Sequence, residues 1–365
     1  YYSVIGGWIT KYFALYLFSG GSAAAQDGFF TSFITSPVSP IVFMLLFLAL
    51  TAWVVYCGVE KGIEKFSRYI MPGLLLLIIG IAIFSLTLSY TDESGVTRTG
   101  MDGFLVYIKP DFTGLTVPRF LNIVLDAMSQ LFFSLSVSMG IMITYGSYVK
   151  DDVDLNKANN QIEIFDTGVA FLAGLMIIPA VFSFSGGDPD TLQAGPALMF
   201  ITIPKVFESM GLGTVVGILF FTLVLFAAVT SSIALTESAV STFEDELGWD
   251  RKQATILIGI IMLVLGSLSA LGYGPLARFT VFGMQFLDFF DFLTNSVMMP
   301  IAAITTCLLV SRVIGVEKIE EEVTLDGKPF RRRRIFNFMI KYLCPIFAAI
   351  ILVSSVANAL GVISM

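Results

Sequence analysis

Three serine hydroxyls and a glycine lie close together in the middle of one apolar segment. Residues 132–140 read FFSLSVSMG, with serines at positions 134, 136 and 138. A serine hydroxyl can hydrogen-bond nearby backbone groups, and glycine lowers the cost of leaving helical geometry. A helix broken at membrane depth is tolerated only where its freed backbone groups face protein, an ion or water. The segment therefore predicts either a broken helix that lines a binding site or a continuous helix whose serines bond back to the preceding turn.

A second group of hydroxyls lies in another apolar segment. Residues 227–232 read AAVTSS. Hydroxyl and carbonyl oxygens are hard ligands that suit an alkali cation. The alternative is that these hydroxyls only bond the carbonyls of their own helix.

Composition identifies the class of protein and excludes several kinds of site. The chain has 365 residues, of which 56% are hydrophobic and only 13% charged, and its mean hydropathy is +0.85. These values are typical of a membrane protein with several spans. Histidine is absent, so a histidine metal site or proton relay is impossible. The three cysteines have no disulfide or metal-ligand spacing, and no nucleotide-binding glycine loop is visible, which argues against an ATP-driven pump.

Apolar segments of spanning length predict nine membrane-crossing helices. They cover residues 1–25, 39–57, 69–89, 121–149, 161–185, 212–242, 253–271, 286–310 and 335–361. Residues 90–120 are mixed polar and predict a solvated loop. The apolar piece 197–201, between two prolines, is too short to span. It predicts a re-entrant or lid-like helix, or a helix lying on lipid headgroups.

Lys and Arg set the expected orientation, because cytoplasmic loops are enriched in them. Most of the 21 basic residues fall in one alternate set of loops, so we expect that set to be cytoplasmic. With nine spans, the N-terminus of the chain would be cytoplasmic and the C-terminus outside. The basic run 331–334 is interpreted as a topological anchor rather than a nucleic-acid or lipid-headgroup site.

Carboxylates in or beside the spans are energetically costly in hydrocarbon, so each one indicates either a functional site or a position near the membrane surface. Asp166 lies one or two turns into the fifth predicted span, Asp288 and Asp291 lie near the outer end of the eighth, and residues 244–246 end the sixth. For each, reaching the membrane surface is the alternative to a role in a site.

Five stretches together resemble the neurotransmitter:sodium symporter family, in particular its bacterial members that carry amino acids. The stretches are FFSLSVSMGIMITYGSYV at 132–149, VTSSIAL at 229–235, FEDEL at 243–247, LDFFDF at 287–292 and YY at 1–2. The resemblance implies an all-α integral membrane protein with the LeuT fold, which contains two inverted five-helix repeats. It implies no enzymatic activity.

The resemblance also implies how the chain is divided. Residues 1–120 would be the remainder of the first repeat with an outer loop, 121–310 the second repeat, and 311–365 a cytoplasmic loop and a last span. The resemblance implies that the family's first two helices have no counterpart among these 365 residues, and that the first of them would supply part of both sodium sites.

Individual site residues follow from the matched motifs. Those matched to the substrate site are Tyr2, Phe133, Ser136, Met139, Ser231 and Leu235. Those matched to two sodium sites are Ser134, Asp166, Ala227, Thr230 and Ser231. Those matched to gates are Tyr2, Phe133 and Asp291 on the outer side and Tyr148 and Asp245 on the inner side. Ser138 departs from the glycine of many relatives. Asp166 would supply the negative charge that chloride supplies in other members, so chloride would not be required.

The function predicted in this way is sodium-coupled symport of neutral hydrophobic amino acids by alternating access, in the cell (inner) membrane. Its partners would be the amino acid and the lipid bilayer, and no nucleic acid. Two alternatives remain open: a non-transporting membrane receptor or assembly partner, and a proton-coupled permease on the same fold.

Overall fold

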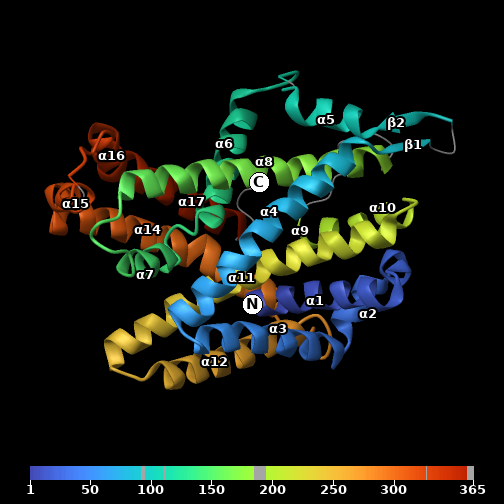
Figure 1. The fold of residues 1–365 in the computed structure, drawn as a ribbon, viewed down its shortest axis with the longest axis horizontal. Helices are drawn as coiled ribbons and strands as arrows, with labels where there is room; N and C mark the ends of the chain where they lie inside the picture. Colours follow the sequence, from blue (N-terminus) through green and yellow to red (C-terminus); the bar gives the residue numbers. More distant parts are fainter. Residues whose placement is uncertain (92–94, 111, 185–194, 326, 360–365) are drawn as a thin grey trace. The chain divides into compact units, whose positions relative to one another are not determined.

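The computed structural model describes residues 1–91, 95–110, 112–184, 195–325 and 327–359, and it is almost entirely helical (Figure 1). These residues form two compact units. The first comprises Tyr1–Asp111, Gly168–Thr236 and Val240–Leu287, and the second comprises Phe112–Thr167, Glu237–Ala239 and Asp288–Met365. Helices α8 and α11 contribute residues to both units.

Seven helices in the described ranges are long and apolar enough to cross a membrane. They are α3 (Ser39–Tyr56), η2 with α4 (Val59–Leu86), α8 (Leu155–Phe184), α11 (Gly213–Leu247), α12 (Arg251–Leu271), α13 to η6 (Phe286–Ile314) and α16 to α17 (Arg333–Ala359). They match seven of the nine predicted spans. The other two correspond to α1 (Tyr2–Ser19), which is less apolar because it carries Lys11 and several tyrosines, and to a helix interrupted between α6 (Val117–Ser134) and α7 (Ile141–Ser147).

The spanning helices contain several shorter elements. These are η2 (Val59–Glu64), α4 (Lys65–Leu86), α13 (Phe286–Asp291), η5 (Phe292–Met298), α14 (Met299–Leu308), η6 (Leu309–Ile314), α16 (Arg333–Phe338), η7 (Met339–Leu343) and α17 (Cys344–Ala359). Every η element among them is a π-helical stretch. The charged residues at the start of η2 continue the helix, so that span begins about ten residues before the predicted start at residue 69.

Close helix packing in the first unit depends on glycine. Helices α1, α3 and α12 lie side by side (Figure 1). A methyl group at Gly7 would lie 2.6 Å from the backbone nitrogen of Met44, and one at Gly266 would lie 2.7 Å from the Met44 sulfur. Small residues at such positions let helix backbones approach, which is the usual way that helices associate in a membrane.

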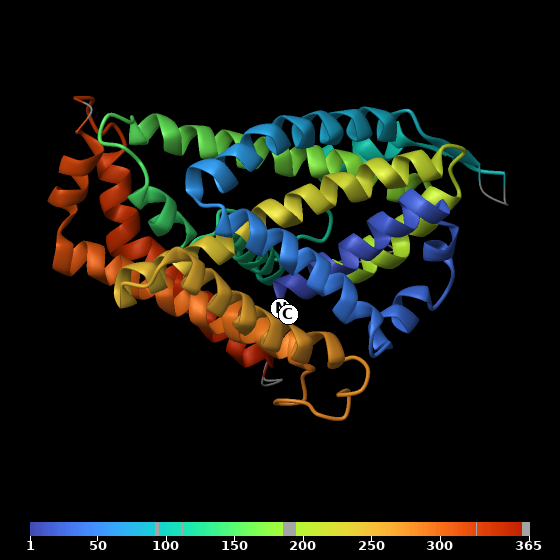
Figure 2. The same cartoon turned by 60° about the horizontal axis from the view of Figure 1, so that its bottom comes forward.

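The piece bounded by Pro196 and Pro204 is helical and packs against protein. It comprises α9 (Gly195–Ala197), η4 (Leu198–Thr202) and α10 (Ile203–Glu208), and it lies beside α1 (Figure 2). Phe200 is only 1% exposed, stacks on Phe30 with ring centroids 5.2 Å apart, and meets Trp8 edge-on. The Tyr12 hydroxyl donates to the Phe200 carbonyl at 2.8 Å. Because this apolar face is buried in protein, the lipid-headgroup alternative is wrong.

Residues 90–120, predicted as a solvated loop, contain secondary structure. Strands β1 (Ser89–Thr91) and β2 (Thr97–Thr99) form an antiparallel pair, and α5 (Gly100–Ile108) follows at once. Thr99 and Asp102 cap α5 reciprocally: the Asp102 amide donates to the Thr99 hydroxyl and the Thr99 amide donates to the Asp102 carboxylate. This capping box was present in the sequence, and it stabilises the helix start.

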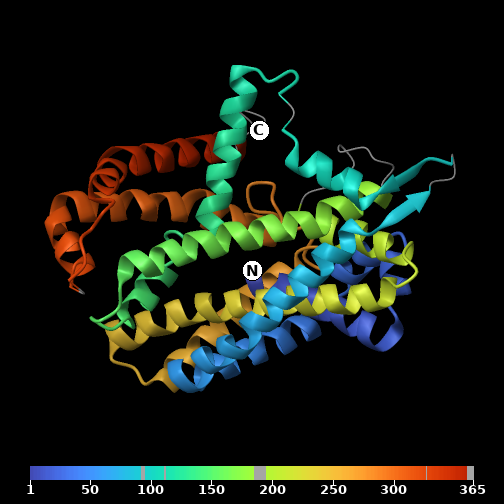
Figure 3. The ribbon, with the colours of Figure 1, turned by 45° about the horizontal axis from the view of Figure 1, so that its top comes forward.

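In the second unit, α14 and α17 lie side by side, and α6 is the upright helix of Figure 3. The connection between η6 and α16 contains α15 (Val316–Val323). The remaining short elements, both in the first unit, are η1 (Ser22–Ala25) and α2 (Phe29–Thr35).

Candidate functional site

The interruption between α6 and α7 is a true break in the helix. The amide of Leu135 still bonds the carbonyl of Leu131, and the next helical bond is the one from the Thr144 amide to the Gly140 carbonyl. Between them, Ser136 and Ser138 adopt left-handed backbone angles, with φ of 53° and 65°. A left-handed conformation costs an L-residue about 1–2 kcal/mol, so the surrounding contacts must hold the segment open. The continuous-helix alternative is therefore wrong.

Gly140 is the residue on which the break depends most. Its φ is 80°, it begins α7, and an added Cβ would lie 2.5 Å from the Ser238 hydroxyl oxygen. We expect Gly140→Ala to lower the free energy of unfolding by about 1–2 kcal/mol, because alanine is strained at this φ. Gly146→Ala is the matched control, since Gly146 is helical with open space beside it, and it should be neutral or slightly stabilising. Thermal unfolding of the two purified variants measures this. Equal stability of both variants would contradict it.

The break places Ser134 against Asp166. The Ser134 hydroxyl, at the end of α6, donates to a carboxylate oxygen of Asp166 on α8 at 2.6 Å. Asp166 is partly buried, one turn beyond Glu163 along the helix. Ser134 therefore does not bond back to its own helix, and Asp166 does not simply reach toward the surface. The Ser134 hydroxyl and the Asp166 carboxylate, both of which the family match assigns to sodium binding, therefore lie within hydrogen-bond distance of each other.

The hydroxyls of α11 point to three different partners. The Thr230 hydroxyl donates to the Ala227 carbonyl at 2.9 Å, as the alternative reading of this triplet expected. Ser231 lies near the hydroxyl of Tyr2 on α1. Ser232, which is 1% exposed, accepts a hydrogen bond from the Thr51 hydroxyl of α3 at 3.1 Å. The structure thus brings together Tyr2, Ser231, Thr230 and Ala227, while the partnership of Thr51 was not predicted.

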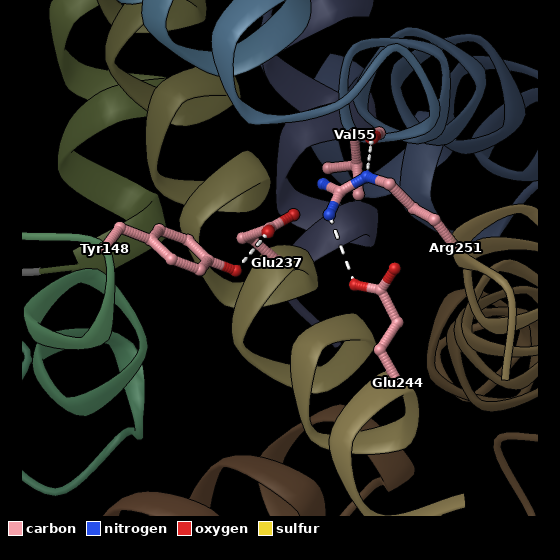
Figure 4. A network of polar contacts seen from close by, with 5 residues as sticks. All are labelled: Val55, Tyr148, Glu237, Glu244 and Arg251. Atoms are coloured by element: carbon pink, nitrogen blue, oxygen red, sulfur yellow. Dashed lines mark hydrogen bonds and ion pairs between the residues drawn. The ribbon is translucent and has the colours of Figure 1, made fainter. Parts of the chain in front are cut away.

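A buried carboxylate on α11 was missed by the sequence analysis. Glu237 is fully buried, and its carboxylate accepts a hydrogen bond of 2.7 Å from the hydroxyl of Tyr148 at the end of α7 (Figure 4). The sequence does indicate a site here, because an acid inside the apolar run 212–242 is energetically costly unless it is paired. The acids singled out from the sequence near this helix end were those at 244–246. Tyr148, matched to the inner gate, therefore has Glu237 as its partner.

One of the acids at the end of α11 forms an ion pair. Glu244, rather than Asp245, pairs with Arg251, at 3.2 Å. The Arg251 Nε donates to the Val55 carbonyl at the end of α3, which joins three helix ends of the first unit (Figure 4). Asp245 is exposed and has no partner in the part of the chain that the structure describes. Its predicted place in the inner gate remains a prediction.

The other predicted residues are placed as follows. Phe133 borders a cavity of about 310 Å³ in the second unit, which is also lined by Asp126, Gln130 and Asn295. The carboxylate of Asp291 accepts a hydrogen bond of 2.8 Å from the side-chain amide of Asn295. Ser136 and Met139 lie in the break, and the Ser238 hydroxyl donates to the Met139 carbonyl at 3.4 Å.

Leu235 lies on α11 in the first unit. Phe133 and Tyr2 belong to different units, so their contact as a gate remains a prediction.

Comparison with known proteins identifies this arrangement of helices. Residues 31–362 match the Sodium:neurotransmitter symporter family. An uncharacterized sodium-dependent transporter of Bacillus subtilis is 35% identical, over 100% of this chain and 77% of that protein. One of Haemophilus influenzae is 30% identical, over 97% of this chain and 75% of that protein. The crystal structure of MhsT in complex with L-phenylalanine is similar with a TM-score of 0.81 and 35% identity, covering 97% of this chain and 77% of that one.

These findings confirm the resemblance noted in the sequence and the all-helical membrane fold. The family and the fold are those of secondary transporters and not of enzymes. The chain belongs to the sodium:neurotransmitter symporter family and is a multi-pass, sodium-dependent membrane transporter.

Proposed function

We propose that the protein couples the entry of sodium to the uptake of neutral hydrophobic amino acids by alternating access. The observation that carries the proposal is the contact between the Ser134 hydroxyl and the Asp166 carboxylate at a broken helix. A carboxylate and a hydroxyl beside unwound backbone are the hard oxygen ligands that a small cation prefers.

Two sodium ions are proposed, one for each group of oxygens. The first would bind at Ser134 and Asp166, and the second at Ala227, Thr230 and Ser231. The Thr230 hydroxyl and the Ala227 carbonyl lie 2.9 Å apart, so an ion could take both oxygens in exchange for the hydrogen bond between them. Asp166 would balance the charge of the first ion, and transport would then be independent of chloride.

The substrate is proposed from the residues that the family match assigns to the substrate site. Phe133, Met139 and Leu235 are apolar, Met is flexible, and an apolar pocket separates neighbouring hydrophobic side chains by only about 1–3 kcal/mol per methylene. We therefore expect several large neutral amino acids to be carried. The presence of L-phenylalanine in the structure of MhsT supports this class of substrate. Ser136, Ser231 and Tyr2 would provide the polar contacts.

Alternating access would require gates on both sides of the site. Tyr2, Phe133 and Asp291 are proposed for the outer gate, and Tyr148, Glu237 and Asp245 for the inner gate. We also propose nine spans, counting α1 and the interrupted α6–α7 pair, with repeats at 1–120 and 121–310 and a last segment at 311–365. The N-terminus of the chain would be on the cytoplasmic side of the cell (inner) membrane and the C-terminus outside.

Uptake of labelled phenylalanine by the native protein in proteoliposomes tests the proposal. Uptake should require an inward sodium gradient and should be inhibited by leucine but not by glycine or lysine. Thr230→Val removes one oxygen and should raise the sodium concentration for half-maximal uptake several-fold. Thr222→Val is the control, because the Thr222 hydroxyl also bonds its own helix, at Ile218, outside the predicted site. Undiminished uptake without sodium would overturn the proposal.

A further inference from the structure

The four consecutive arginines at 331–334 fall into two pairs with different surroundings. One Nη of Arg332 lies 2.9 Å from both carboxylate oxygens of Glu163, and Arg333 lies 2.8 Å from a carboxylate oxygen of Glu320. Arg331 and Arg334 are exposed and form no ion pair with any residue that the structure describes. Two of the four charges are therefore already balanced, and two are free to attract an anion from outside the protein.

The segment that carries the free arginines is tied to α8. Lys328 forms an ion pair of 2.6 Å with Asp154, and this pair holds the pKa of the Asp154 carboxyl below its usual range. Asp154 also accepts a hydrogen bond from the Lys157 amide in the first turn of α8. With the pair between Arg332 and Glu163, the segment is attached to α8 at two points. These attachments fix where Arg331 and Arg334 are presented.

The helix that follows these arginines, α16 to α17, also presents cationic and aromatic side chains on its surface. Phe338 and Tyr342 are 56% and 59% exposed, and their ring centroids lie 6.0 Å apart, so both rings are on one side of the helix. Arg334 lies four residues before Phe338, and Lys341 is exposed without an ion pair in the described part of the chain. Residues four apart on a helix are neighbours. Cationic side chains thus alternate with aromatic rings along one face, at the end where the candidate span Arg333–Ala359 begins.

We propose that Arg331, Arg334 and Lys341 form a binding site for the phosphate headgroups of anionic phospholipids. Basic residues next to a membrane-spanning helix attract acidic lipids, and aromatic rings are enriched at that depth. A guanidinium group binds phosphate oxygens in a bidentate manner. The topological anchor predicted from the sequence for residues 331–334 remains a prediction, and the lipid site is proposed in addition to it. None of these three residues is among those proposed for sodium or substrate.

Titration of phosphatidylglycerol into the purified protein in neutral detergent tests the proposal. The unfolding temperature should rise with a saturating dependence on phosphatidylglycerol, and phosphatidylcholine should have no such effect. The single variants Arg331→Gln and Arg334→Gln should each raise the half-saturating lipid concentration about fivefold. The double variant Arg331→Lys with Arg334→Lys keeps the charges and should bind lipid more tightly than the double glutamine variant.

The matched control is Arg332→Gln with Arg333→Gln, which removes the same charge from the paired residues. This control should keep the half-saturating concentration of the parent protein. An equal loss of lipid response in the control would show that net charge alone is responsible and would overturn the proposal. A stabilisation by inorganic phosphate equal to that by phosphatidylglycerol would also overturn it, because the ligand would then be a free anion and not a lipid.

Discussion

Asp166→Asn should raise the sodium concentration for half-maximal uptake at least about tenfold, or abolish uptake. Asparagine has nearly the same size and still meets the Ser134 hydroxyl, but it lacks the negative charge. Opposite charges at 4 Å attract by about 4 kcal/mol in an environment of intermediate dielectric, and a tenfold change needs only about 1.4 kcal/mol. The sodium dependence of phenylalanine uptake in proteoliposomes measures the effect.

Glu163→Gln is the matched control for this variant. It removes the same charge one turn away on α8, where Glu163 pairs with Arg332 and not with Ser134, so its sodium dependence should stay close to that of the parent. Added chloride should restore part of the uptake of Asp166→Ser, since it can supply the missing charge. If Asp166→Asn transported normally at every sodium and chloride concentration, Asp166 would have no part in ion binding.

Tyr148→Phe should lower the free energy of unfolding by about 1–3 kcal/mol and increase substrate leak. The tyrosine hydroxyl donates to Glu237, whose side chain is fully buried. Removing that donor leaves the buried carboxylate of Glu237 with one hydrogen bond fewer. Because water does not reach the carboxylate to replace the lost bond, the folded state is destabilised. Thermal unfolding measures the first effect, and efflux of labelled substrate from loaded proteoliposomes measures the second.

Tyr145→Phe provides the control, because Tyr145 lies one turn earlier on α7 and makes no hydrogen bond with its hydroxyl in the described residues. A double-mutant cycle with Glu237→Gln should give a coupling energy of at least about 0.5 kcal/mol with Tyr148→Phe and a smaller one with Tyr145→Phe, whose hydroxyl lies near Glu237 without a hydrogen bond to it. Equal couplings for the two tyrosines would rule out a specific contact between Tyr148 and Glu237.

The positions of most helices could be predicted from the sequence because a span must carry enough apolar residues to cross the bilayer. The run 39–57 became α3 at Ser39–Tyr56, and 253–271 became α12 at Arg251–Leu271. The break near Gly140 was only one of two possibilities, since a serine hydroxyl serves either outcome. The left-handed angles of Ser136 and Ser138 decide between them, and they depend on contacts that local sequence does not contain.

Pairings between distant segments could not be predicted from residue types alone. Thr51 and Ser232 are separated by 181 residues, and Tyr148 and Glu237 by 89. Nothing local marks Thr51 as a partner, because its hydroxyl also satisfies the common bond to the carbonyl four residues earlier. The contact between Ser134 and Asp166 could be anticipated only from the family resemblance, which supplied a relation between two segments that the residues themselves did not.

The aromatic contacts around Trp8 allow the position of η4 to be followed by tryptophan fluorescence. The protein has three tryptophans, of which Trp8 is 2% exposed while Trp53 and Trp249 are 64% and 39% exposed. Trp8 meets Phe200 of η4 and Phe30 edge-on, in surroundings that exclude water. Its fluorescence will therefore be emitted at short wavelength, and quenchers that reach the protein surface from water or from lipid will act mainly on the other two. With Trp53 and Trp249 replaced by phenylalanine, the remaining emission would report any change in the contact between η4 and α1 without an attached dye.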